Sequence, residues 1–224
     1  MSGGSPLSFV VPGIAIAGED PRERAWRAQV AAAARAAGAR RASGLVLSFG
    51  LTSDRIRIDI DNLARPALDA MRDAGVATRG FIGVDAVLAT KRTDVPPGLT
   101  VLATTAQTVR DIPCPGEPLI SVAARAVPRD GDRDSKLLWR EAVSTVWSGR
   151  PVLTGPAFVD VTLRTSLSLK NALKPLVDGL EPVLGRDPHG RLEFCPNDDL
   201  VTWLRVMRAD GLAPVVMRLG RCEL

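Results

Sequence analysis

The feature that most constrains the fold of this chain is an internal repeat. Each half begins with a short apolar segment, followed by an amphipathic helical segment that contains a Trp-Arg pair. These features are 7–12 with Trp26 in the first half, and 119–127 with Trp139 in the second. Both tryptophans are interpreted as core anchors. Because a repeat of about 100 residues corresponds to a recurring structural unit, the chain is expected to contain the same unit twice.

A second motif supports the repeat. In each half an Asn is followed three positions later by a basic residue, then directly by Pro, and after three more residues by Asp. Strand-like segments lie before and after this motif, with Pro and Gly at the turns. The motif residues are Asn62, Arg65, Pro66 and Asp69 in the first half, and Asn171, Lys174, Pro175 and Asp178 in the second. The strand-like segments are 45–58, 85–91 and 99–104, and then 158–167, 199–207 and 213–219.

These patterns predict an α/β (α+β) chain built from two tandem β-α-β-α-β-β units. The units are expected at 1–111 and 119–224. The proline-rich stretch 112–118 lies between them and is typical of a linker. A hydrophobic content of 46% is ample for a packed core.

Two acids in the first half are candidates for a metal site. Asp59 and Asp61 alternate with isoleucines, so at a strand end their carboxylates would project to the same face. Two close carboxylates repel each other unless they are solvated, protonated or bridged by a cation. Mg²⁺ suits such a pair, and Asp85 at the head of the next strand is expected to supply a third oxygen ligand. The alternative is structural: Asp61 caps a helix and Asp59 is an exposed charge.

The second half provides an internal comparison for these acids. Ser168 and Lys170 occupy the positions that correspond to Asp59 and Asp61. The fold therefore does not require both acids at this joint, which favours a function for them in the first half. Because Lys170 would place a positive charge where the metal should lie, no metal site is expected in the second half.

These residues resemble the RusA-type Holliday junction resolvases, which are small endonucleases. The matching signature is Asp59-Ile60-Asp61-Asn62, Arg65, Leu68-Asp69-Ala70-Met71 and Asp85-Ala86-Val87. The resemblance implies Mg²⁺-dependent hydrolysis of a DNA phosphodiester by water, with symmetric nicks made by a homodimer on a branched junction. It also implies that Asp59, Asp61 and Asp85 are the metal ligands, and that the two units form an intrachain pseudo-dimer.

The chain departs from the family signature in two places. Arg65 replaces a lysine; it keeps the charge that could hold a phosphate or stabilise the transition state, but cannot readily donate a proton. The interval between Asp61 and Asp85 is longer than usual, with an insertion at 75–84. The residues expected to contact DNA are Asn62, Arg65, Lys91 and Arg92 in the first half, and Lys170, Lys174, Arg205 and Arg208 in the second.

Composition narrows the functional classes. A net charge of +4 and a pI near 9.4 suit a polyanionic partner such as DNA. The three cysteines are far apart and show neither a disulfide framework nor zinc-ligand spacing. His189 is the sole histidine, which disfavours Ser-His-Asp or Cys-His catalysis.

No apolar stretch approaches the roughly 20 residues of a membrane span, and no secretory signal is visible, so a cytoplasmic location is expected.

The sequence therefore predicts a Mg²⁺-dependent, structure-selective DNA endonuclease of recombination or repair. With one metal site a chain would cut one strand per binding event, so paired nicks would require a homodimer. An alternative is a DNA-binding or scaffolding protein that has lost catalysis. A nuclease with a restriction or toxin role would share the same chemistry.

Overall fold

The computed structural model describes residues 6–18, 20–77, 83–166, 168–190, 193–209 and 214–223. Within these residues the chain forms eight strands, six α-helices and two short 3₁₀ turns. The strands are β1 (Leu7–Pro12), β2 (Gly44–Gly50), β3 (Ala86–Arg92), β4 (Gly98–Thr104), β5 (Pro118–Ala124), β6 (Ala157–Leu163), β7 (Val201–Arg208) and β8 (Val215–Arg221). The helices are α1 (Glu23–Ala36), α2 (Ile60–Asp73), α3 (Ala106–Asp111), α4 (Arg133–Trp147), α5 (Leu169–Asp178) and α6 (Glu181–Leu184), and the 3₁₀ turns are η1 (Ser53–Arg55) and η2 (Asp198–Leu200).

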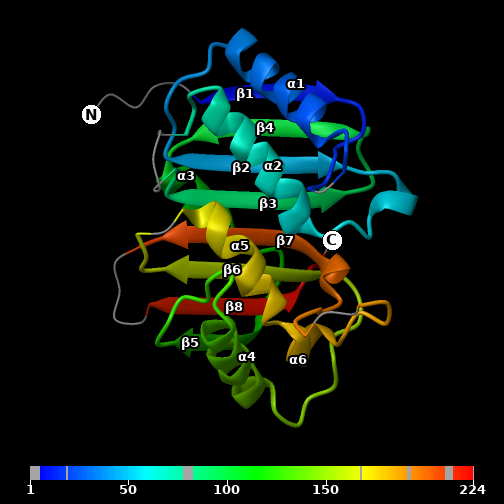
Figure 1. Cartoon of the computed structure of the whole chain (residues 1–224), viewed down its shortest axis with the longest axis vertical. Helices are drawn as coiled ribbons and strands as arrows, with labels where there is room; N and C mark the ends of the chain where they lie inside the picture. Colours follow the sequence, from blue (N-terminus) through cyan, green and yellow to red (C-terminus); the bar gives the residue numbers. More distant parts are fainter. Residues whose placement is uncertain are drawn as a thin grey trace.

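All the described strands belong to one sheet, with the order β1-β4-β2-β3-β7-β6-β8-β5 (Figure 1). The first half contributes β1-β4-β2-β3, and the second half contributes β5-β8-β6-β7, so the strand order of one half recurs in the other. In both halves the second and third strands along the chain pair in parallel, and the other pairs are antiparallel. The halves meet where β3 and β7 pair antiparallel, which makes the sheet continuous.

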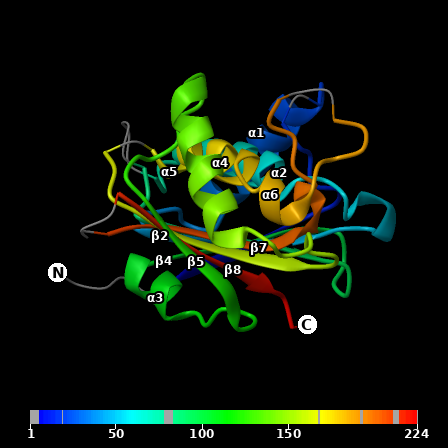
Figure 2. The ribbon, with the colours of Figure 1, turned by 90° about the horizontal axis from the view of Figure 1, so that it is seen from below.

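Most helices cover one face of the sheet, and α3 lies on the other (Figure 2). Alternation along the strands explains this layering, because side chains two residues apart share a face. In β2, Leu45, Leu47 and Phe49 are fully buried under the helices. Trp26 and Trp139 are both buried, which agrees with their interpretation as core anchors. Helices α2 and α5 lie side by side above the centre of the sheet (Figure 1).

The opposite face carries a buried charge network that closes the joint between the halves. Arg205, 3% exposed, donates from Nε to Asp160 Oδ1 at 2.7 Å. Its Nη1 also donates to the carbonyl oxygens of Val109 and Arg110 at the end of α3. Arg205 therefore ties the stretch before β5 to the sheet, and its predicted DNA contact is wrong because the guanidinium is buried.

Several boundaries differ from the sequence prediction. Strand β2 ends at Gly50 rather than at residue 58, and η1 occupies part of the difference. A Cβ on Gly50 would lie 2.1 Å from the carbonyl oxygen of Pro96, so the chain needs glycine at this close approach. Helices α3 and α6 were not expected. Half of the insertion predicted at 75–84, residues 78–82, lies outside the described residues. No helix in the described part of the chain is long and apolar enough to cross a membrane.

Candidate metal centre

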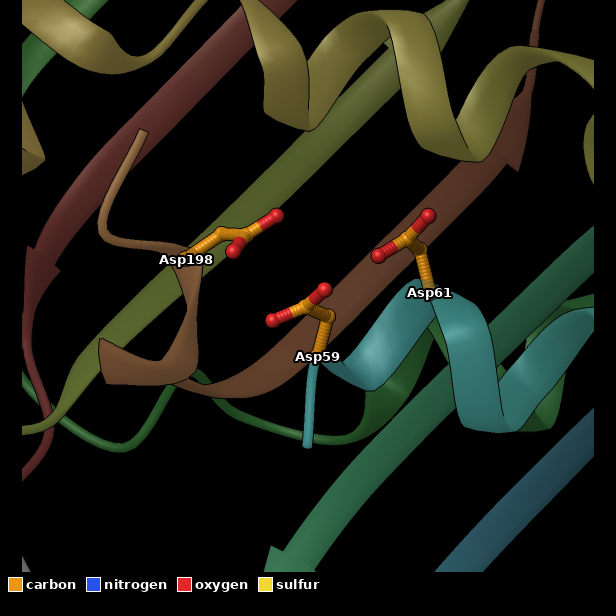
Figure 3. A group of neighbouring side chains, drawn as sticks. All are labelled: Asp59, Asp61 and Asp198. Carbon is orange, nitrogen blue, oxygen red and sulfur yellow. The ribbon is translucent and has the colours of Figure 1, made fainter. Parts of the chain in front are cut away.

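Three aspartates converge at the central joint of the sheet. One oxygen from each of Asp59, Asp61 and Asp198 lies within 4.8 Å of the others (Figure 3). Asp59 is the N-cap residue of α2, Asp61 lies in the first turn of that helix, and Asp198 begins η2. These residues could hold a metal ion, since carboxylate oxygens are the ligands of hard divalent cations.

The centre is composite, because each half of the chain supplies part of it. Helix α2 begins after the carboxyl end of β2, and β2 runs parallel to β3. The start of α2 therefore lies near the carboxyl end of β3. Because β7 runs antiparallel to β3, the amino end of β7, preceded by Asp198, reaches the same place. The antiparallel pairing of the two halves thus brings Asp198 to the acids of the first half.

The structure does not bring Asp85 to this group. Asp85 precedes β3 at its amino end, which is the opposite end of the strand from α2's first turn. Its Oδ1 lies 3.4 Å from Arg208 Nε. The third carboxylate comes instead from Asp198, which stands beside Asp199, the sequence counterpart of Asp85. The sequence signal that could have pointed to it is the acidic pair Asp198-Asp199 shortly before the third strand of the second half.

Asp61 lies inside α2 and Asp59 is the residue that precedes this helix, so neither acid stands at the end of a strand. The expected strand-end alternation is therefore wrong, although both carboxylates still face the same space (Figure 3). Asp59 has no side-chain hydrogen bond to the helix backbone, so it does not act as a capping acceptor. Its Oδ2 instead accepts a hydrogen bond from Asn62 Nδ2 at 2.7 Å. Asn62 thereby orients Asp59. It is also partly exposed, and its contact with DNA stays a prediction.

Asp61 is the most unusual member of the centre. It is 1% exposed, and neither of its carboxylate oxygens has a hydrogen-bond partner in the described structure. Burial raises the pKa of Asp61 from 3.8 to about 6; the charge of Lys174 opposes this rise, and the charge of Asp59 adds to it. A buried carboxylate without a partner is costly, so a bound cation fits this position.

Asp198 also favours its protonated form in the absence of a cation. Burial, the negative charge of Asp59 and a hydrogen bond with Asp59 hold the pKa of Asp198 far above its ordinary range. Without a cation, a proton between Asp59 and Asp198 therefore relieves the repulsion. A divalent ion would relieve the same repulsion between the carboxylates and would give the oxygens of Asp61 a partner. The three carboxylates therefore fit such an ion.

Lys91 lies beneath the centre and is 3% exposed. Its Nζ donates to the carbonyl oxygens of Ile56 and Ile58 at 3.0 Å, and to that of Asp199 at 2.7 Å. Burial lowers the pKa of Lys91 to about 8, while the charges of nearby aspartates oppose this change. The prediction that Lys91 contacts DNA is wrong, because its ammonium is enclosed. Arg92 is exposed and pairs with Asp94 through Nε at 2.9 Å.

Of the remaining residues predicted to contact DNA, Arg65 and Lys174 lie near the acid cluster, whereas Lys170 lies near Asp69. Arg65 and Lys174 are partly exposed, and the charge of each lowers the pKa of Asp61. Lys174 also lies 3.4 Å from Asp178 Oδ1. Lys170 does not approach the centre; its Nζ lies 2.8 Å from both carboxylate oxygens of Asp69 on α2. Besides the buried Lys91, Arg65 and Lys174 are therefore the predicted cations that act on the acid cluster.

The second half forms a corresponding joint with different side chains. Ser168 and Lys170, at the start of α5, line a cavity of about 450 Å³ together with Gly83 and Asp69. The internal repeat relates this place to the acid cluster, because the two halves meet where β3 pairs with β7. An ammonium paired with Asp69 occupies the position where the first half presents the carboxylate of Asp61.

Two carboxylates of one half and one of the other thus define the candidate centre, with two cations nearby. This arrangement can bind a divalent ion and present positive charge to an anionic substrate. Its function has to be inferred from this geometry, because no protein-family model matches the chain and no curated protein matches its sequence.

Proposed function

We propose that this chain is a Mg²⁺-dependent, structure-selective DNA endonuclease that hydrolyses phosphodiesters of branched DNA, similar to the RusA-type resolvases. The observation that best supports this proposal is the convergence of Asp59, Asp61 and Asp198, in which Asp61 is buried with both oxygens unpartnered. In this proposal the two halves are RusA-like units that form an intrachain pseudo-dimer, and the second half is degenerate.

The residues of the centre have distinct roles in the proposed reaction. Asp59, Asp61 and Asp198 would hold Mg²⁺, and Asn62 keeps the Asp59 carboxylate in place. A bound Mg²⁺ would supply the activation of a water molecule and would offset the charge that develops on the phosphate. In the overall reaction the water oxygen adds to phosphorus, one P–O bond of the diester breaks, and a phosphate monoester and a hydroxyl result.

Arg65 and Lys174 supply the positive charge that the substrate phosphate requires. They come from α2 and α5, the two helices that lie side by side above the central joint. Arg65 is suited to contact two phosphate oxygens but not to donate a proton. Lys174 retains the lysine chemistry. Burial opposes its charge, but the charges of Asp178 and Asp61 outweigh this and raise its pKa, so it is protonated at neutral pH. Lys174 of the second half thus supplies the proton donor that Arg65 of the first half does not.

The described residues form one composite centre, which implies one cut per binding event. Paired nicks across a branched DNA would require two chains, as a homodimer or as successive binding events. A cytoplasmic role in recombination or repair is part of the same proposal. The basic composition, with a net charge of +4, is consistent with a DNA partner.

The experiment that tests this proposal is cleavage of a labelled four-way junction beside a linear duplex, with Mg²⁺ or EDTA. We expect Mg²⁺-dependent cutting of the junction that is lost in Asp61→Asn and Asp198→Asn. Asp85→Asn is the matched control, because this acid lies away from the centre, and it should keep cutting. If the wild type binds the junction tightly but does not cut it with Mg²⁺ or Mn²⁺, the chain is a DNA-binding or scaffolding protein instead.

A further inference from the structure

Lys91 joins the two backbone segments that carry the carboxylates of the metal centre. It lies one residue before the end of β3, on the helix-covered face of the sheet. Two of its hydrogen bonds hold the carbonyl oxygens of Ile56 and Ile58, directly before Asp59. The third holds the carbonyl oxygen of Asp199, directly after Asp198. One ammonium group therefore contacts the acid-bearing segments of both halves.

We propose that Lys91 is a positioning residue that assembles the composite metal centre from the two halves of the chain, a role that rests on the proposed metal site. An ammonium group has three donors, and Lys91 directs all three to backbone carbonyls. It therefore leaves the carboxylate oxygens available for the metal. Its buried charge also offsets part of the repulsion among Asp59, Asp61 and Asp198 before the metal binds.

The segments that Lys91 holds have little regular structure of their own. Residues 56–58 form an irregular connection after η1, and Asp199 belongs to the single turn of η2. Such segments are positioned by a small number of contacts. Three charge-assisted hydrogen bonds to one rigid strand thus fix where Asp59 and Asp198 stand relative to each other.

The second half contains a counterpart of this clamp. Arg208 ends β7, as Lys91 stands at the end of β3. Its Nη1 donates to the carbonyl oxygen of Thr165, in the segment before Ser168 and α5. Its Nε lies 3.4 Å from Oδ1 of Asp85, which belongs to the other half. Each end of the β3–β7 pairing is therefore held by one such clamp. In the described structure only the Lys91 clamp lies next to three carboxylates.

The paired clamps allow a matched experiment on the full-length chain. Mn²⁺ affinity is measured by electron paramagnetic resonance, and Mg²⁺ affinity by competition, for wild type, Lys91→Met and Arg208→Met. We expect Lys91→Met to weaken Mn²⁺ binding by about 10–100-fold, the usual effect of removing a group that orients metal ligands. Arg208→Met should bind Mn²⁺ within about twofold of wild type, because its clamp serves the joint without the acid cluster. Melting temperatures of both variants, measured in EDTA, report the purely structural effect.

Two further variants make the outcome decisive. Lys91→Gln keeps donors but loses the charge, and it replaces Lys91→Met in the comparison if that variant does not fold. Lys91→Arg restores a charged donor and should recover part of the lost affinity. The proposal is overturned if the Lys91 variants bind Mn²⁺ as tightly as wild type, or if Arg208→Met weakens binding equally. Failure of the wild type to bind Mn²⁺, or unchanged binding by Asp61→Asn, would instead overturn the metal centre itself.

Discussion

Replacing Asp61 with asparagine should stabilise the metal-free protein while abolishing its response to metal. The pKa of Asp61 is raised from 3.8 to about 6 by burial, so folding favours the protonated acid. The destabilisation is therefore absent below pH 3.8, grows as the pH rises to about 6, and is fully present at pH 7. Because one pH unit of difference in pKa corresponds to about 1.4 kcal/mol, ionised Asp61 destabilises the metal-free fold by about 3 kcal/mol at pH 7.

The amide introduced by Asp61→Asn recovers most of this free energy. It is neutral, and its NH₂ group can donate to the neighbouring carboxyl groups of Asp59 or Asp198, although part of the amide stays unsatisfied. We therefore expect a net stabilisation of about 1–3 kcal/mol at pH 7 in EDTA. For a chain of this size that corresponds to a rise in melting temperature of about 2–12 °C. The rise should shrink towards zero near pH 4.

The assay is thermal unfolding of wild type and Asp61→Asn in EDTA at pH 4 and pH 7, and then at pH 7 with Mg²⁺ or Mn²⁺. Metal should raise the melting temperature of the wild type and leave that of the variant unchanged. Asp178→Asn is the matched control: Asp178 is also a buried helical aspartate, but it pairs with Lys136 at 3.0 Å, so its loss should destabilise by about 2 kcal/mol. If Asp61→Asn lowers the melting temperature in EDTA as Asp178→Asn does, the electrostatic reasoning about Asp61 is refuted.

Three further outcomes follow from the structure. Calorimetry should show that Asp198→Asn loses most of the Mn²⁺ affinity, whereas Asp85→Asn keeps it; the reverse result would restore the ligand set expected from sequence. Because the pKa values of Asp61 and Asp198 are raised, protons compete with metal, and Mn²⁺ affinity should rise by about tenfold per pH unit for each proton displaced; a pH-independent affinity between pH 6 and pH 8 would contradict this. Gly179→Ala should destabilise by about 1–3 kcal/mol in thermal unfolding, because its Cβ would lie 2.2 Å from Trp139 Cδ1; an unchanged melting temperature would show that Trp139 can move aside.

The sequence was sufficient for the eight strands, for four of the helices (α1, α2, α4 and α5) and for two of the three carboxylates. The local sequence pattern matches the fold at the two tryptophans, Trp26 and Trp139, at the Asn-to-Asp motif and at the apolar segments. Asp59 and Asp61 were recognisable because the second half lacks them. The third carboxylate was misplaced because its position depends on the pairing of β3 with β7, which links positions more than a hundred residues apart and leaves no local pattern.

Strand alternation could have corrected one further assignment. Val87, Ala89 and Lys91 lie on the same face of β3, and the first two belong to the core beneath the helices. A lysine in this series points inward, whereas the sequence-based expectation placed it on the surface. Its buried position was thus predictable from alternation, but its three carbonyl partners were not, because they come from irregular segments of both halves.

Because the two halves are one polypeptide, the starts of α2 and α5, which form the two joints, can acquire different amino-acid substitutions. In a homodimer built from one such unit, every substitution would appear at both joints, so neither could lose its acids without the other. Here a single polypeptide carries Asp61 at one joint and Lys170 at the other, and each position varies independently. Tethering also keeps the halves at an effective concentration of about millimolar. The composite site therefore persists at dilutions at which separate subunits would part.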